Sequence, residues 1–206
     1  MIQALNELVS LIHWIHAQGW SPATSTNYSM RDSDSSQQAY VSSSGVDKDN
    51  FALEHFILMD LNATQLEGYQ HLKPSAETAI HLMLYQQTDC KVVVHTHSKA
   101  DTLLSRLNVN DKQLILKDYE LLKGLRNIKS HTEKTVVPIF ENTQDIQALS
   151  TEMSGYLLQH SDCQGLLIES HGFYTWGRSV SEAKRHLEVF QFLLDCELEL
   201  LKLKEC

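Results

Sequence analysis

The chain has 206 residues, with 17 basic and 26 acidic side chains and a formal net charge of −9. This length predicts one domain with a sizeable core. The 42% apolar and 21% charged residues are typical of a folded protein rather than a disordered one. A negative charge without any run of Lys and Arg argues against partners such as nucleic acid or an anionic membrane.

The sequence also indicates where such a protein works. No apolar stretch approaches the ~20 residues that a membrane span needs, and the residues after Met1 lack the pattern of a signal peptide. The four cysteines form neither a close pair nor a zinc-knuckle spacing; they are Cys90, Cys163, Cys196 and Cys206. We therefore expect a cytoplasmic protein with ordinary reduced thiols.

The first half of the chain predicts a helix, three strands and a second helix. Residues 2–18 have an apolar period typical of a helix, which ends at Gly19. The expected strands are 28–30, 39–41 and 56–59, the first two antiparallel and joined by the polar turn 32–38. Pro74, Ser75 and Glu77 are typical of a helix start and predict a helix over 75–87.

The second half predicts alternating strands and helices. The expected strands are 91–97, 136–140, 165–168 and 173–176. The expected helices are 98–107, 144–160 and 180–204, and the stretch 111–124 also has a mostly helical period. Together these elements predict one α/β domain over residues 1–206, with a mainly antiparallel central sheet between helices.

Two histidines stand at the end of an apolar strand, in the sequence His95-Thr96-His97. Side chains two apart on a strand share a face, roughly 6–7 Å apart at the backbone, so both imidazoles can reach one ion at ~2.0–2.1 Å. The alternative is that one ring packs in the core and the other lies on the surface. His171 precedes Gly172 at a junction of two expected strands, where a glycine permits a sharp turn. Three histidines with an open position are typical of a catalytic metal site, although His171 could be an ordinary exposed turn residue.

Two carboxylates are candidates for proton transfer beside such a metal, because they lie in segments that flank the histidine strand. Glu77 stands in the first turn of its expected helix, where a simple capping role is the alternative. Glu120 follows an apolar run, and the alternative there is a solvated helix face.

Small hydrogen-bond donors cluster in three places, at 24–27, at Ser43-Ser44-Gly45 and at Ser75. Hydroxyls and free amides at turns and helix starts can bind a phosphate without a basic patch, although ordinary turn chemistry is the alternative. The other histidines have no partner spacing and are interpreted as core or surface residues; they are His13, His16, His55, His71, His81, His131, His160 and His186.

Taken in order, these segments resemble the class II aldolase/adducin family over residues 19–201. The shared pattern is a Thr-x-x-Asn turn, a Ser-Gly turn, Pro-Ser-x-Glu, His-x-His and His-Gly. A finer resemblance, to the members that dehydrate 5-methylthioribulose 1-phosphate in methionine salvage, covers the segments 95–100, 119–124, 137–143 and 171–177. Its specific parts are Tyr119-Glu120-Leu121-Leu122-Lys123-Gly124 and Val137-Pro138-Ile139-Phe140-Glu141-Asn142-Thr143.

The resemblance implies a lyase that removes water from this phosphorylated ketose by way of a metal-stabilised enediolate. It implies one zinc ion per subunit, held by His95, His97 and His171, and a ring-shaped homotetramer. Glu120 aligns with the proposed acid/base of the dehydratases, and Glu77 with the catalytic glutamate of the aldolases. The positions that match the phosphate-binding turns are Thr24, Asn27, Ser44, Gly45 and Ser75.

One departure from the family pattern affects the first turn. The family usually has glycine just before Asn27, where this chain has Thr26, so the backbone path there and the contact of Asn27 with phosphate are in question. Three other functions stay open: a zinc-dependent sugar-phosphate aldolase or pentulose-phosphate epimerase, a non-enzymatic adducin-like binding domain, and a generic α/β protein with structural histidines.

Overall fold

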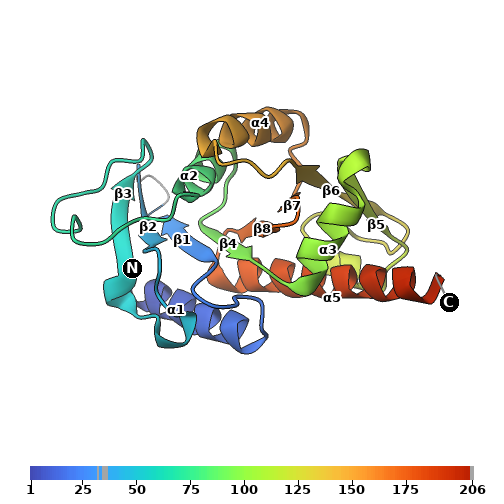
Figure 1. Cartoon of the computed structure of the whole chain (residues 1–206), viewed down its shortest axis with the longest axis horizontal. Helices are drawn as coiled ribbons and strands as arrows, with labels where there is room; N and C mark the ends of the chain where they lie inside the picture. Colours follow the sequence, from blue (N-terminus) through green and yellow to red (C-terminus); the bar gives the residue numbers. More distant parts are fainter. Residues whose placement is uncertain (32, 34–36, 205–206) are drawn as a thin grey trace.

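A computed structural model describes residues 1–31, 33 and 37–204 (Figure 1). These residues form one eight-stranded sheet in the order β3-β2-β1-β4-β8-β7-β6-β5. Among the described strands only β6 and β7 pair in parallel, so the sheet is mixed but mainly antiparallel. The strands are β1 (Asn27–Arg31), β2 (Gln38–Ser42), β3 (Phe56–Asp60), β4 (Val92–Thr96), β5 (Gln113–Lys117), β6 (Lys134–Phe140), β7 (Gly165–Ile168) and β8 (Gly172–Gly177).

Five α-helices of the described residues cover the two faces of the sheet (Figure 1). They are α1 (Ile2–Ala17), α2 (Thr78–Gln87), α3 (Lys99–Leu107), α4 (Ile146–Gln159) and α5 (Val180–Lys204). Side chains of α1, α3 and α5 share one apolar cluster, and those of α2 and α4 share the other. In β4, Val92 and Val94 belong to the first cluster and Val93 to the second, as the two-residue period of a strand requires. Since His95 has the parity of Val93, its ring lies on the α2 and α4 side.

The structure confirms most of the predicted elements. Helix α1 ends at Ala17, and Gly19 takes the left-handed conformation that stops it, with φ +76°. The predicted turn 32–38 lies largely outside the described residues, as does Cys206. Cys90, Cys163 and Cys196 are free thiols, as expected. No helix among the described residues has the combined length and apolar character of a membrane span.

Two predicted elements were wrong in type or start. The stretch 111–124 is not a helix: it forms strand β5, which pairs with β6, and then the short 3-10 helix η4 (Glu120–Gly124). Leu114 and Leu116 are buried while the residues between and beside them are exposed, so the period is two rather than helical. Helix α2 begins at Thr78 instead of Ser75, because 75–77 form a turn in which Ser75 accepts hydrogen bonds from the Glu77 amide and the Thr78 hydroxyl.

Buried polar contacts anchor the segment that follows β4. The Ser98 side chain caps α3 by accepting from the Asp101 amide, and the Asp101 carboxylate accepts in return from the Ser98 amide at 3.0 Å. The same carboxylate accepts from Thr96 Oγ1 and from Gln191 Nε2 of α5, at 3.2 and 2.9 Å. Burial raises the pKa of Asp101 to about 6. The chain on both sides of His97 is therefore fixed by hydrogen bonds from α3 and α5.

Packing of α4 on the sheet provides a direct test of the core. Leu157 is buried, whereas its neighbour Leu158 is 73% exposed. Leu157→Ala should lower the free energy of unfolding by about 2–4 kcal/mol, because it leaves a cavity in the α2/α4 cluster. Leu158→Ala, the matched control, should change it by no more than about 0.5 kcal/mol. Urea denaturation of both variants measures the difference, and equal costs would show that α4 does not pack as described.

Candidate active site

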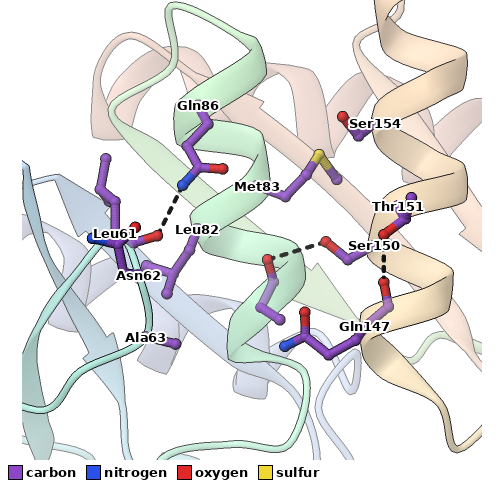
Figure 2. Close-up of a pocket in the computed structure, with 11 residues that line it drawn as sticks. Leu61, Asn62, Ala63, Leu82, Met83, Gln86, Gln147, Ser150, Thr151 and Ser154 are labelled. Carbon is purple, nitrogen blue, oxygen red and sulfur yellow. Dashed lines mark hydrogen bonds between the residues drawn. The ribbon is translucent and has the colours of Figure 1, made fainter.

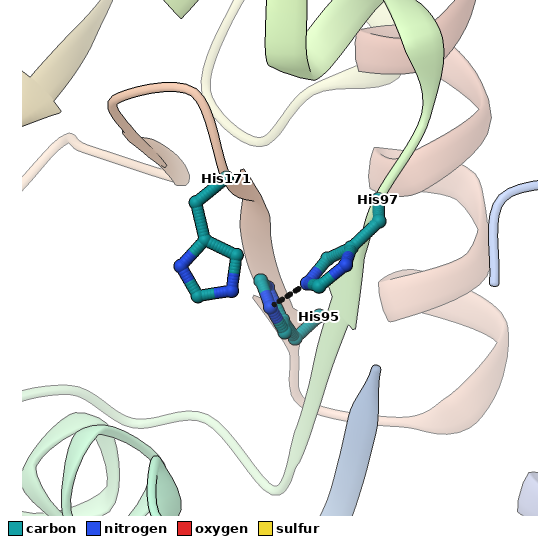
Figure 3. Close-up of side chains that lie close together, drawn as sticks. All are labelled: His95, His97 and His171. Carbon is teal, nitrogen blue, oxygen red and sulfur yellow. Dashed lines mark hydrogen bonds between the residues drawn. The ribbon is translucent and has the colours of Figure 1, made fainter. Parts of the chain in front are cut away.

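The pairing of β4 with β8 brings three histidines together. His95 lies opposite Tyr174, and Thr96 lies opposite Phe173, so the start of β8 runs beside the end of β4. His171 immediately precedes β8, and its ring faces those of His95 and His97 (Figure 3). The ring centroids are 4.6 Å apart for His95 and His97, 5.2 Å for His95 and His171, and 4.7 Å for His97 and His171.

These three rings fit a divalent transition metal. One ring nitrogen from each residue lies within 4.8 Å of the other two, so all three can reach one central ion at ~2.0–2.1 Å. His95 Nδ1 donates to the Phe173 carbonyl at 3.0 Å, which leaves the Nε2 lone pair directed toward the other histidines. Burial lowers the pKa of His95 well below its ordinary value and that of His97 to about 4. Both rings are therefore neutral near pH 7, the form that binds a metal.

Glycine is required at position 172 because a side chain would not fit there. A methyl group there would collide with the Thr96 carbonyl oxygen and would lie 2.7 and 2.6 Å from the rings of His95 and His97. The prediction that Gly172 provides the sharp turn was wrong, because the residue with left-handed backbone in this turn is Ser170, with φ +53°. The absence of a side chain at Gly172 lets His171 approach the other two ligands.

Glu77 faces the histidines instead of capping its helix. It is the N-cap residue of α2, but its side chain makes no capping hydrogen bond. One carboxylate oxygen lies 3.0 Å from His171 Nε2, and the other lies 3.5 Å from His95 Nε2. Although burial raises the pKa of Glu77, its electrostatic interactions with the His95 and His171 rings and its hydrogen bonds with His171 and Asn27 hold that pKa well below its usual value. Glu77 therefore places an ionised carboxylate beside the candidate metal position, and the capping interpretation was wrong.

A directed chain of buried hydrogen bonds fixes Asn27 against Glu77. Asn27 Nδ2 donates to the carboxylate at 2.5 Å, so its Oδ1 must face the other way and accept from His81 Nε2. His81 Nδ1 then accepts from Ser29 Oγ at 2.7 Å, and Ser29 Oγ accepts from Tyr85 OH at 2.7 Å. Burial lowers the pKa of His81 to about 4, which keeps the ring neutral as this chain requires.

The three clusters of small donors converge at the same end of the sheet. Asn27 Nδ2 also donates to Ser75 Oγ at 3.1 Å, which joins the first turn to the helix start. The Ser44 amide donates to the Lys73 carbonyl at 2.8 Å, and Ser43 forms a β-bridge with Pro74. Gly45 takes φ +78°, which favours glycine, and Ser44 and Gly45 are exposed. Thr24 is exposed in the first turn, so these donors are accessible to a ligand.

Thr26 takes the conformation that a glycine would take. Its φ of +71° is unusual for a β-branched residue, and its Oγ1 lies 2.9 Å from the Tyr28 hydroxyl. The His97 amide donates to the Trp20 carbonyl at 2.8 Å, which ties this turn to the histidine strand. The departure from the family pattern at Thr26 therefore leaves Asn27 directed toward the site.

The structure does not bring Glu120 to the histidines of its own chain. The Glu120 side chain is 71% exposed on η4 and forms ion pairs with Lys123 and His131. None of its ion pairs among the described residues reaches His95, His97 or His171. Any role of Glu120 in proton transfer stays a prediction.

Sequence reasoning missed several residues beside the site. Tyr174 stacks on His95 with ring centroids 4.0 Å apart, and burial with the charge of Glu77 raises its pKa well above the ordinary range. His81 was interpreted as a core or surface residue without a partner, yet it orients Asn27. Its spacing of four from Glu77 was the available signal, since that places both on one side of a helix start. Lys48, a buried cation between two of the turns, carried no such signal.

A hollow between α2 and α4 is separate from this site (Figure 2). It has a volume of about 390 Å³, and none of its lining residues is ionisable. Gln86 Nε2 donates to the Leu61 carbonyl and Ser150 Oγ donates to the Ala79 carbonyl, so its polar groups serve the fold. We assign no chemistry to this hollow.

Comparison with known proteins identifies the family. Residues 6–198 match the model of the Class II Aldolase and Adducin N-terminal domain. The chain belongs to this family. It is 41% identical over 199 residues to the methylthioribulose-1-phosphate dehydratase of Hahella chejuensis, covering 96% of this chain and 94% of that protein. It is 43% identical over 197 residues to the protein of the same name from a Picosynechococcus strain, covering 95% and 92%.

Solved structures agree on the fold. An L-fuculose 1-phosphate aldolase superposes with a TM-score of 0.80 and 18% identity, over 98% of this chain and 88% of that one. The L-fuculose-1-phosphate aldolase of Thermus thermophilus gives a TM-score of 0.77 and 19% identity, over 100% and 98%. At these identities the likeness establishes a class II aldolase fold.

The close approach at Gly172 predicts a selective loss of metal. Gly172→Ala should weaken metal affinity by at least about tenfold and so lower the metal content of the purified protein, because displaced ligands or their supports weaken metal sites by 10–100-fold. Gly155→Ala is the matched control, since Gly155 lies in α4 with no atom within 4 Å of an added methyl group. Elemental analysis of both purified variants tests this prediction. Full metal content in Gly172→Ala would show that the histidines do not converge as described.

Proposed function

We propose that this chain catalyses the dehydration of 5-methylthioribulose 1-phosphate to 2,3-diketo-5-methylthiopentyl 1-phosphate and water, a step of methionine salvage. The observation that carries the proposal is the convergence of His95, His97, His171 and Glu77 in a chain whose relatives, at 41–43% identity over nearly their whole length, have that name. Residues 1–206 act as one domain, in the cytoplasm.

Zinc is the metal we propose, one ion per subunit on the three histidines. Three imidazoles with an open position are typical of catalytic zinc, although other divalent ions share this preference and availability decides between them. When bound, the ion supplies Lewis-acid stabilisation of the negative charge that develops on the ketone oxygen, worth several kcal/mol.

Proton transfer requires two events at neighbouring carbons. A base removes the proton from the carbon next to the ketone, and an acid protonates the hydroxyl that leaves from the following carbon, which gives an enol that tautomerises to the diketone. Glu77 is an ionised carboxylate beside the histidines, 13% exposed and held by Asn27. It is therefore suited to hold or move a proton there. The donors at Thr24, Asn27, Ser44, Gly45 and Ser75 are proposed to bind the phosphate.

Glu120 is the second candidate acid/base. Because its side chain is exposed, the proposal includes an oligomer in which Glu120 acts in another subunit. We place it in the site of a neighbouring subunit within a ring-shaped homotetramer, because its own chain keeps it away from the histidines. Exposed apolar side chains on α3, β5, η4 and α5 suit a contact between subunits; they are Leu103, Leu107, Ile115, Leu121, Leu200 and Leu203.

The activity is tested with the purified, metal-loaded protein and a panel of sugar phosphates. Methylthioribulose 1-phosphate should yield the diketone phosphate, whereas fuculose, rhamnulose and ribulose phosphates should yield neither triose products nor epimers. Cleavage or epimerisation of a sugar phosphate without dehydration would instead identify an aldolase or epimerase. The metal content is measured in parallel, and a metal-loaded protein that turns over none of these substrates would favour a binding domain.

The role of Glu120 is tested by substitution and by mixing subunits. Glu120→Gln should lower kcat by about 10²–10⁴-fold, the usual contribution of a general acid or base, with unchanged zinc content. Glu77→Gln should also lower kcat. If each site takes Glu77 from one chain and Glu120 from another, tetramers that contain both variants should regain part of the activity. Near wild-type turnover by Glu120→Gln would exclude the residue, and a failure of mixed tetramers to recover would exclude its action between subunits.

A further inference from the structure

Lys48 is a buried lysine at the junction of the first two donor turns. Its side chain is fully buried, at 0% exposure, although lysine is almost never buried without a paired charge. Nζ donates to the Val46 carbonyl at 2.8 Å and to the Thr24 carbonyl at 3.3 Å. The side chain therefore connects the turn that leads to Asn27 with the turn that contains Ser44 and Gly45.

This amine has no carboxylate partner within ion-pair distance in the described part of the chain. Its neighbour Asp47 is exposed, and an oxygen of that carboxylate accepts from the Asp49 amide. Burial lowers the pKa of Lys48 to about 8, so the side chain is still mostly charged near pH 7. A buried cation that faces only carbonyl oxygens costs free energy in the absence of an anion.

The hydrogen bonds of Lys48 place its amine between the first turn and the second turn. Two carbonyls accept two of the three ammonium protons, which leaves one proton for an anion held by the two turns.

We propose that Lys48 is an anion-binding residue of the active site, which binds the phosphate group of the substrate together with the neutral donors of the two turns. The proposal rests on the proposed function for the identity of the substrate, but the affinity for phosphate itself does not depend on turnover. The sequence predicts a phosphate site made only of hydroxyls and amides, and Lys48 adds the positive charge that such a site lacks.

The test measures binding of inorganic phosphate to the metal-loaded protein by calorimetry. Lys48→Met should weaken phosphate binding by about 10- to 100-fold, because hydrogen bonds between charged groups are the strong ones. Lys134→Met is the matched control, since Lys134 is exposed on β6, and its phosphate affinity should be unchanged. Unchanged affinity in Lys48→Met would overturn the proposal.

Two further measurements separate charge from structure. Lys48→Arg keeps the positive charge, whereas Lys48→Gln keeps only the ability to form hydrogen bonds. The arginine variant should therefore bind phosphate more tightly than the glutamine variant. Equal affinities of these two variants would overturn the proposal, even if Lys48→Met does not fold.

In steady-state kinetics of Lys48→Met, KM should rise at least about tenfold with a much smaller fall in kcat, as expected when the residue binds a non-reacting group of the substrate. A fall in kcat alone would place Lys48 at the reacting atoms instead and would also overturn it. If the wild-type protein turns over no methylthioribulose phosphate but the phosphate results hold, the substrate is wrong and the role of Lys48 stands.

Discussion

The close approach of β8 to the end of β4 is the constraint on which the candidate site depends. The two strands pair antiparallel through Thr96 and Phe173, and the next step along the chain brings His171 toward His95 and His97. Only a residue without a side chain fits at Gly172, against a backbone carbonyl and two imidazoles. The buried Asp101 and Gln191 fix the other end of the ligand segment, so the three rings are held by the core and not by a flexible loop.

Asn27 connects the candidate metal site to the donor turns. Its amide donates to Glu77 and to Ser75, which makes one side chain part of both the carboxylate region and the proposed phosphate region. The hydrogen bond from His81 prevents the amide from turning over, because the opposite orientation would place its oxygen against the carboxylate. A neutral, buried histidine outside the ligand set therefore determines how two functional regions are arranged.

The sequence was sufficient for local features, whereas the arrangement of Glu77, His81 and Lys48 depends on contacts far along the chain. The His-x-His spacing on a strand and the apolar periods predicted the sheet and most helices, since both reflect local geometry. Residues 111–124 were mistaken for a helix because Leu114 and Leu116 pair with β6, a contact that a helical period cannot indicate. Glu77 has the position of a cap, and only the approach of His171, far later in the chain, shows that its side chain turns elsewhere.

Charge balance relates these missed residues to one another. Glu77 is a nearly buried anion beside the three imidazoles, and Lys48 is a buried cation on the side of the donor turns. In the proposed site, a divalent cation on the histidines would leave Glu77 and the metal with a net positive charge, to which Lys48 adds one more. A phosphate dianion would offset that excess, so the proposed site approaches neutrality only with metal and substrate both bound. Since uncompensated buried charge is costly, we expect such a site to favour a phosphorylated ligand over an uncharged sugar of the same shape.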